Sequence, residues 1–162
     1  SRAGSLEILV GKMVPSAVVI LVQSVVLFAA GVLLFDLVIS GSIAALATMI
    51  VVTTVFLVAL SMLCVALFTT INQLSAAANV GAMILGGLGG ALAPVSVLPS
   101  WAQTIAPVSP AYWSLEGFRA VILDGGGMGS IVRPSGILLA ASVVAAAVAS
   151  TRFRFTDEKE WS

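Results

Sequence analysis

The chain has 162 residues, of which 60% are hydrophobic and only 9% are charged, and its formal net charge is zero. An ordinary soluble domain is about a quarter charged, so a water-soluble core cannot bury this much apolar surface and the solvent must be lipid. Without a basic tract, nucleic acid is not an expected partner. No histidine and a single cysteine, Cys64, exclude an internal disulfide and argue against a metal site.

Residues 1–14 predict a short amphipathic helix. Its apolar side chains recur with helical spacing on one face and are Leu6, Leu9, Val10 and Met13. Glu7 and Lys12 fall outside that face. A helix this short cannot span a bilayer, so we expect it to lie on the membrane surface or to dock on a partner.

Four apolar segments follow, each of about the length that crosses a hydrocarbon core of roughly 30 Å. They are residues 17–39, 43–68, 76–93 and 135–151. Residues 15–162 therefore predict one transmembrane domain, and Pro15 is expected to open its first helix. The expected fold is an all-α polytopic membrane protein with four transmembrane helices, the N-terminal amphipathic helix and a re-entrant helical hairpin before the last span.

A stripe of small residues marks the third apolar segment. The stripe recurs every four residues and consists of Ala78, Ala82, Gly86 and Gly90. Small residues at this spacing let two helix backbones approach closely. The stripe predicts helix packing, either against a helix of the same subunit or against a second copy of the chain.

Glycine and proline interrupt the chain before the last span. The prolines are Pro94, Pro99, Pro107 and Pro110. We expect two short helices over residues 97–122, broken at Pro107, with Ser109 as N-cap and Pro110 as the first helical residue. Irregular backbone at membrane depth survives only where protein or water surrounds it. This predicts either a re-entrant hairpin that closes one end of a pathway, which we prefer, or an ordinary external loop.

The same region gathers aromatic and charged side chains. Trp101, Tyr112 and Trp113 suit the headgroup level, where aromatic belts form. Glu116 and Arg119 lie one helical turn apart and can pair. Charges inside a membrane are expensive and usually functional, although a solvated surface pair is the alternative. No nucleophile or second carboxylate accompanies them, so an enzyme is not expected.

The distribution of basic residues predicts the orientation. The end segments carry Arg2, Lys12, Arg152, Arg154 and Lys159, whereas the turn at residues 36–42 carries none. The positive-inside rule then places both termini in the cytoplasm. We expect a multi-pass protein of a bacterial cell membrane.

Three stretches resemble the permeases of type-2 ABC exporters. The first two are GSLEIL with GKMVP before a span, and FTTINQLSAAANV at a cytoplasmic turn. The most specific is ALAPVSVLPSWAQTIAPVSPAYWSLEGFRAVIL, which is similar to the family's loop of "LP-x-W" and "P-x-x-Y/W" steps before a Glu and an Arg. The resemblance covers nearly the whole chain. It implies the C-terminal four-span portion of a six-span permease.

This resemblance implies partners and roles. An exporter would combine two permease copies, identical or different, with two ATP-binding subunits. This chain lacks a Walker-type lysine loop, so ATP hydrolysis would belong to the partner, and no enzyme activity or cofactor is expected here. By this resemblance, we expect Leu6, Glu7, Leu9 and Lys12 to contact the ATP-binding subunit. The residues themselves, apart from the resemblance, predict the other two roles. We expect a re-entrant outer gate at Pro99, Trp101, Pro107, Pro110, Tyr112, Glu116 and Arg119, and helix packing at Ala82, Gly86 and Gly90.

The apolar spans favour an exported compound that is hydrophobic or amphipathic, drug-like or lipid-like. A permease for glycans or lipid-linked carbohydrates is an alternative, but it would favour aromatic side chains along the spans. A membrane scaffold without transport, or an intramembrane enzyme, is a third reading. An enzyme would need paired polar residues inside the spans.

Overall fold

The computed structural model describes residues 2–157, and within this range every regular element is helical. The α-helices are α1 (Arg2–Phe35), α2 (Ile43–Leu67), α3 (Ile71–Gly89), α4 (Ser100–Ile105), α5 (Pro110–Ile122) and α6 (Val132–Asp157). Three short 3-10 helices are η1 (Val95–Val97), η2 (Ala106–Val108) and η3 (Met128–Ile131).

Three stretches of the described chain are helical, long and apolar enough to cross a membrane. They are Met13–Phe35, Ile43–Leu67 and Met128–Arg152. These spans confirm the all-α polytopic class. Helix α3 has 19 residues but is not among them, because Asn72, Gln73 and Asn79 lower its mean hydropathy. Its role as a fourth span stays a prediction.

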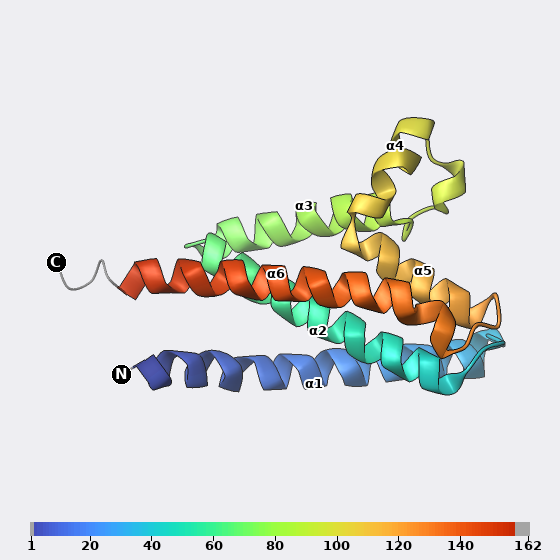
Figure 1. The fold of residues 1–162 in the computed structure, drawn as a ribbon, viewed down its shortest axis with the longest axis horizontal. Helices are drawn as coiled ribbons and strands as arrows, with labels where there is room; N and C mark the ends of the chain where they lie inside the picture. The colour runs from blue at the N-terminus through green and yellow to red at the C-terminus, as the bar shows by residue number, and fades with distance from the viewer. Residues whose placement is uncertain (1, 158–162) are drawn as a thin grey trace.

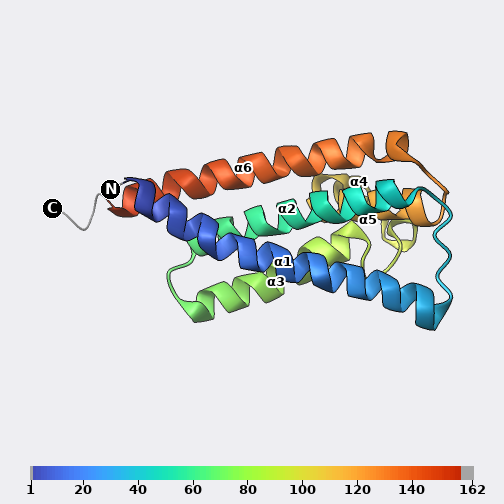
Figure 2. The same cartoon turned by 90° about the horizontal axis from the view of Figure 1, so that it is seen from below.

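Helix α2 lies at the centre of the bundle, where it makes its most extensive contact with α6 and also touches α1, α3 and α5. The start of α1 and the end of α6 lie together at one end, which we call the termini end (Figures 1 and 2). The connection from α1 to α2 lies at the opposite end, beside the connection from α5 to α6. We call this the turn end.

The buried core joins α2, α5 and α6. Its largest fully buried side chains come from all three of these helices or from η3 beside them, and they are Met49, Val121, Ile131 and Leu138. Helix α5 therefore packs with the spans and does not stand apart from them as a detached loop would.

Helix α1 differs from the expected arrangement, because one helix runs through Pro15 without a break. Proline lacks an N–H and crowds the carbonyl four residues earlier, which here is that of Gly11. A Cβ atom at Gly11 would meet nothing within 4 Å, so the unbonded carbonyl is not enclosed by other helices. Transmembrane helices tolerate such prolines. The amphipathic segment and the first span are thus one continuous helix.

Local signals explain where the helices end. Helix α1 stops at Phe35, earlier than expected, because Asp36 adopts a left-handed conformation with φ 50° and Leu37 N–H donates to the Gly31 carbonyl at 3.1 Å. Helix α2 begins at Ile43, directly after its N-cap Ser42, whose hydroxyl accepts from Ala45 N–H. These caps confine the α1–α2 connection to a few residues.

Candidate functional site

Helix α5 begins against the last turn of α3. Ser109 is the N-cap residue of α5, as expected, but its hydroxyl makes no capping bond and donates instead to the Leu85 carbonyl of α3 at 3.4 Å. Gly89 allows the close approach, because a Cβ atom there would lie 3.0 Å from backbone and side-chain atoms of Ala111. Pro110 is the first residue of α5, where a missing N–H costs nothing.

The other end of α5 is tied to the α1–α2 connection. Residues 40–42 contact residues 121–126 through backbone atoms, and we call this contact the junction. The N–H groups of Ser40 and Ser42 donate to two carbonyls of that segment, each at 3.2 Å. Only glycine fits at Gly41, because a Cβ atom would clash with two backbone carbonyls across the junction. The turn and the end of α5 thus share a backbone contact that side-chain motion cannot loosen.

The segment between α3 and α5 folds into short helices. Pro107 lies in η2 and separates α4 from α5. The indole Nε1–H of Trp113 donates to the Pro107 carbonyl at 2.8 Å, and the Gln103 amide donates to the Leu98 carbonyl at 2.7 Å. Trp101 is exposed on α4. The backbone of this irregular segment therefore finds hydrogen-bond partners within the segment and in α5.

The structure does not bring Glu116 and Arg119 together as an ion pair. Both lie on α5 within the described residues, with Glu116 half-buried and Arg119 exposed. The cation that engages this region is Arg133 of α6, whose guanidinium lies 4.9 Å from the ring centre of Trp113. Tyr112 packs edge-on against the same ring, with 5.2 Å between ring centres. Sequence reasoning missed Arg133 because a loop separates it from Trp113.

Gly117 is a second residue that sequence reasoning missed. A Cβ atom there would lie 2.7 Å from Sδ of Met49 in α2 and 3.2 Å from Cβ of Pro134 in α6. Gly117 thus lets three helices meet closely. A lone glycine inside an apolar pattern gives no sign of such a contact.

The remaining predicted residues lie elsewhere. Residues 6–12 are helical in α1, but the side chains of Leu6, Glu7, Leu9 and Lys12 lie outside the described residues. In the small-residue stripe, Ala82 is exposed, and a Cβ atom at Gly86 would meet only Ala91 at 3.7 Å. Gly90 ends α3 with φ 95°. At Gly90 a Cβ atom would lie 2.9 Å from the side chain of Val95 in η1, whereas no described helix packs on Ala82 or Gly86.

The fold and this site define a multi-pass, all-α membrane domain with a broken helical segment tied to the ends of its spans. The family model described as ABC-2 type transporter matches residues 1–123, and the chain belongs to this family. That membership confirms the resemblance seen in the sequence.

One relative among the curated proteins is uncharacterized protein YhgE of Bacillus subtilis (strain 168). The two are 36% identical over 76 residues, which cover 47% of this chain and 10% of that protein. The chain thus spans about a tenth of the length of the relative it matches. No solved structure matches the chain.

Proposed function

We propose that this chain is the transmembrane permease part of an ATP-driven exporter that moves a hydrophobic or amphipathic compound out of the cell. Membership in the ABC-2 type transporter family supports a permease role. An ATP-binding subunit on the cytoplasmic side supplies the energy, and a second permease copy completes the pathway. The chain itself performs no chemistry.

The proposed orientation puts the termini end in the cytoplasm and the turn end outside. It rests on the basic residues of the end segments and on their absence from residues 36–42. The junction and the end of α5 then lie at the outer surface of the cell membrane.

In this orientation α5 supports a re-entrant outer gate. Its 13 residues span about 20 Å at 1.5 Å per residue, and it runs from α3 back toward the turn end (Figure 1). Its start, together with α4 and η2, then lies well below the outer surface. The internal hydrogen bonds of Gln103 and Trp113 suit backbone at that depth. Trp101 and Tyr112 are the bulky side chains of the gate, and the prolines Pro99, Pro107 and Pro110 shape it.

A single structural link carries the proposed mechanism: one uninterrupted helix, α1, leads from the termini end to the turn, and the junction joins that turn to α5. A partner that grips residues 2–14 and tilts α1 would move the turn as part of the same rigid body. The junction would pass this motion to the gate.

A disulfide across the junction tests the proposal. A Cβ atom at Gly125 would lie 3.8 Å from Cβ of Ser40, the mean separation in disulfides. We would make Ser40→Cys with Gly125→Cys in a Cys64→Ala background and reconstitute it with the ATP-binding subunit in proteoliposomes. Because the junction moves as one unit, the bond should form and ATP-driven export of a fluorescent long-chain alcohol should persist.

Two results would contradict this proposal. Export that stops on oxidation and returns on reduction would show that the junction must open, so it could not transmit motion. Absence of ATP-dependent movement in the Cys64→Ala parent protein, across a panel of uncharged amphiphiles, would contradict the export function itself.

A further inference from the structure

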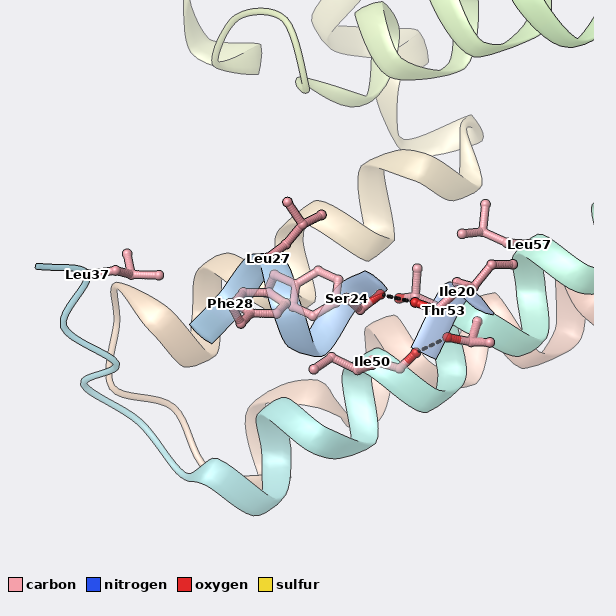
Figure 3. Close-up of a pocket in the computed structure, with 10 residues that line it drawn as sticks. Ile20, Ser24, Leu27, Phe28, Leu37, Ile50, Thr53 and Leu57 are labelled. Carbon is pink, nitrogen blue, oxygen red and sulfur yellow. Dashed lines mark hydrogen bonds between the residues drawn. The ribbon is translucent and has the colours of Figure 1, made fainter. Parts of the chain in front are cut away.

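A cavity of about 290 Å³ lies between α1, α2 and α5. Figure 3 shows side chains from α1, the following turn and α2 around it. Most of its lining is apolar and includes Leu27, Phe28, Leu57 and Phe118. Leu27 is 64% exposed and Leu57 38% exposed, so the cavity opens on the outer face of the spans, where lipid-dissolved molecules can enter.

The cavity wall also carries one hydroxyl group whose hydrogen bonding is incomplete. Hydroxyls on helices usually donate to the carbonyl one turn back, as Ser24 does to Ile20 and Thr54 does to Ile50, both at 2.8 Å. Thr53 also lines the cavity, but its Oγ1 is buried and has no hydrogen-bond partner among the described residues. A buried hydroxyl without a partner is unfavourable, so a partner supplied by a ligand would be stabilising.

The size and polarity of the cavity limit what can fill it. Buried water needs two to four polar partners, and cavities lined by Leu, Ile and Phe stay dry. A cavity of about 150 Å³ holds benzene. By the same proportion, this one holds about 12 non-hydrogen atoms. The occupant is therefore a small apolar molecule or the apolar part of a larger one.

We propose that this cavity binds an uncharged amphiphile, with about ten carbons and a single hydroxyl or carbonyl group that hydrogen-bonds to Thr53. In the empty cavity the Thr53 oxygen is covered, but threonine populates two χ1 rotamers in helices. A rotation of about 120° around this bond moves the hydroxyl group into the position of the methyl group and the methyl group into that of the Cβ hydrogen, which would bring the oxygen to the ligand. That this amphiphile is also the exported compound rests on the proposed function.

The test compares two probes that differ by one hydroxyl, 1-decanol and decane. The full chain in lipid nanodiscs is labelled with a photoreactive decanol, and each probe competes for labelling of α1 and α2, which is mapped by mass spectrometry. Decanol should compete several-fold better than decane. Thr53→Val should weaken competition by decanol about 3- to 10-fold, the effect of one neutral hydrogen bond, and leave competition by decane unchanged.

Two further variants act as controls. Thr48→Val is the same change on the same helix, but the Thr48 hydroxyl bonds to Ala44 and Thr48 does not line the cavity, so competition should not change. Leu57→Trp fills the cavity and should abolish labelling. Equal competition by both probes, unaffected by Thr53→Val, would mean that only lipid chains occupy the cavity and would overturn the proposal. Labelling confined to segments that do not line the cavity, such as α3 and α6, would also overturn it.

The outcomes separate this site from the exporter proposal. If decanol binds through Thr53 but is not exported with ATP, the proposal that this amphiphile is the exported compound is wrong. The proposal of the binding site would still hold. If decanol is exported with ATP, and Thr53→Val alters neither its export nor its binding, the proposed binding site is wrong. The proposed export function would still hold.

Discussion

Helices α1 and α6 both pack on α2, but in different ways. None of the apolar stretch of α1 is buried inside the described chain, against 22% for α2 and 28% for α6. Helix α6 buries Leu138, Ala145 and Ala149. Helix α1 instead leaves two hollows of about 290 and 410 Å³ along its contact with α2. The bundle thus combines a packed unit of α2, α5 and α6 with one loosely held helix.

This difference explains how a helix can move without unfolding the domain. Segments with few buried contacts have low local stability and supply the moving parts of proteins. Helix α1 is such a segment along its length, yet the junction ties the connection that follows α1 to the end of α5. A loosely packed helix such as α1, followed by a connection that is held in place, is better suited to move as a rigid lever than to support the structure.

The largest expected effect is the difference in stability between truncating a leucine on α6 and truncating a leucine on α1. Leu138→Ala removes a fully buried side chain and should lower the free energy of unfolding by about 2–3 kcal/mol. This is the low end of the usual range for such truncations, because surrounding lipid is as apolar as the core. Leu27→Ala on α1 should cost less than about 1 kcal/mol, since its side chain is mostly exposed. Unfolding in mixed detergent micelles measures both, and equal losses would contradict the comparison.

A change at the junction should have the next largest effect. Gly41→Ala places a Cβ atom against two backbone carbonyls, which cannot move aside as side chains can. We expect a local cost of about 2 kcal/mol and hydrogen exchange at the Ser40 and Ser42 amides faster by about 30-fold. Gly129→Ala in η3 is the control, because a Cβ atom there meets nothing within 4 Å. Unchanged exchange in Gly41→Ala would mean that the junction does not form in the membrane.

Inside the packed unit, Gly117→Ala should have a smaller effect. The added methyl group meets the flexible end of Met49 first and Pro134 next, so the cost should be about 1 kcal/mol, at the low end for overpacking. Gly81→Ala on α3 meets nothing within 4 Å and should be neutral or stabilising through helix propensity. A destabilised Gly81→Ala with a neutral Gly117→Ala would reverse the assignment of which helix faces are packed.

Much of the architecture was predictable because the length of apolar segments and the positions of helix-starting and helix-breaking residues are local signals. The all-α membrane class and the helix start at Pro110 follow from residues close together in the sequence. The continuous α1 did not follow, because proline usually starts or ends a helix, whereas transmembrane helices tolerate it.

The candidate site was less predictable, because its contacts join residues far apart in the sequence. Gly41 resembles any other glycine until the end of α5 lies against it, and Gly117 of α5 does so until α2 and α6 lie against it. The expected Glu116–Arg119 pair followed from spacing alone, whereas the observed contact of Arg133 with Trp113 depends on how α6 packs beside α5. Spacing on one helix shows which residues can meet, and tertiary packing decides which do.

The central claim is that α4, η2 and the start of α5 lie within the outer half of the bilayer and that α5 returns to its surface. Spin labels at Thr104, Val108 and Leu123, all exposed positions in the structure, report depth through their access to oxygen and to an aqueous nickel chelate. A re-entrant α5 predicts high oxygen access at Thr104 and Val108 and high nickel access at Leu123. High nickel access with low oxygen access at all three positions would mean an ordinary external loop and would contradict the account.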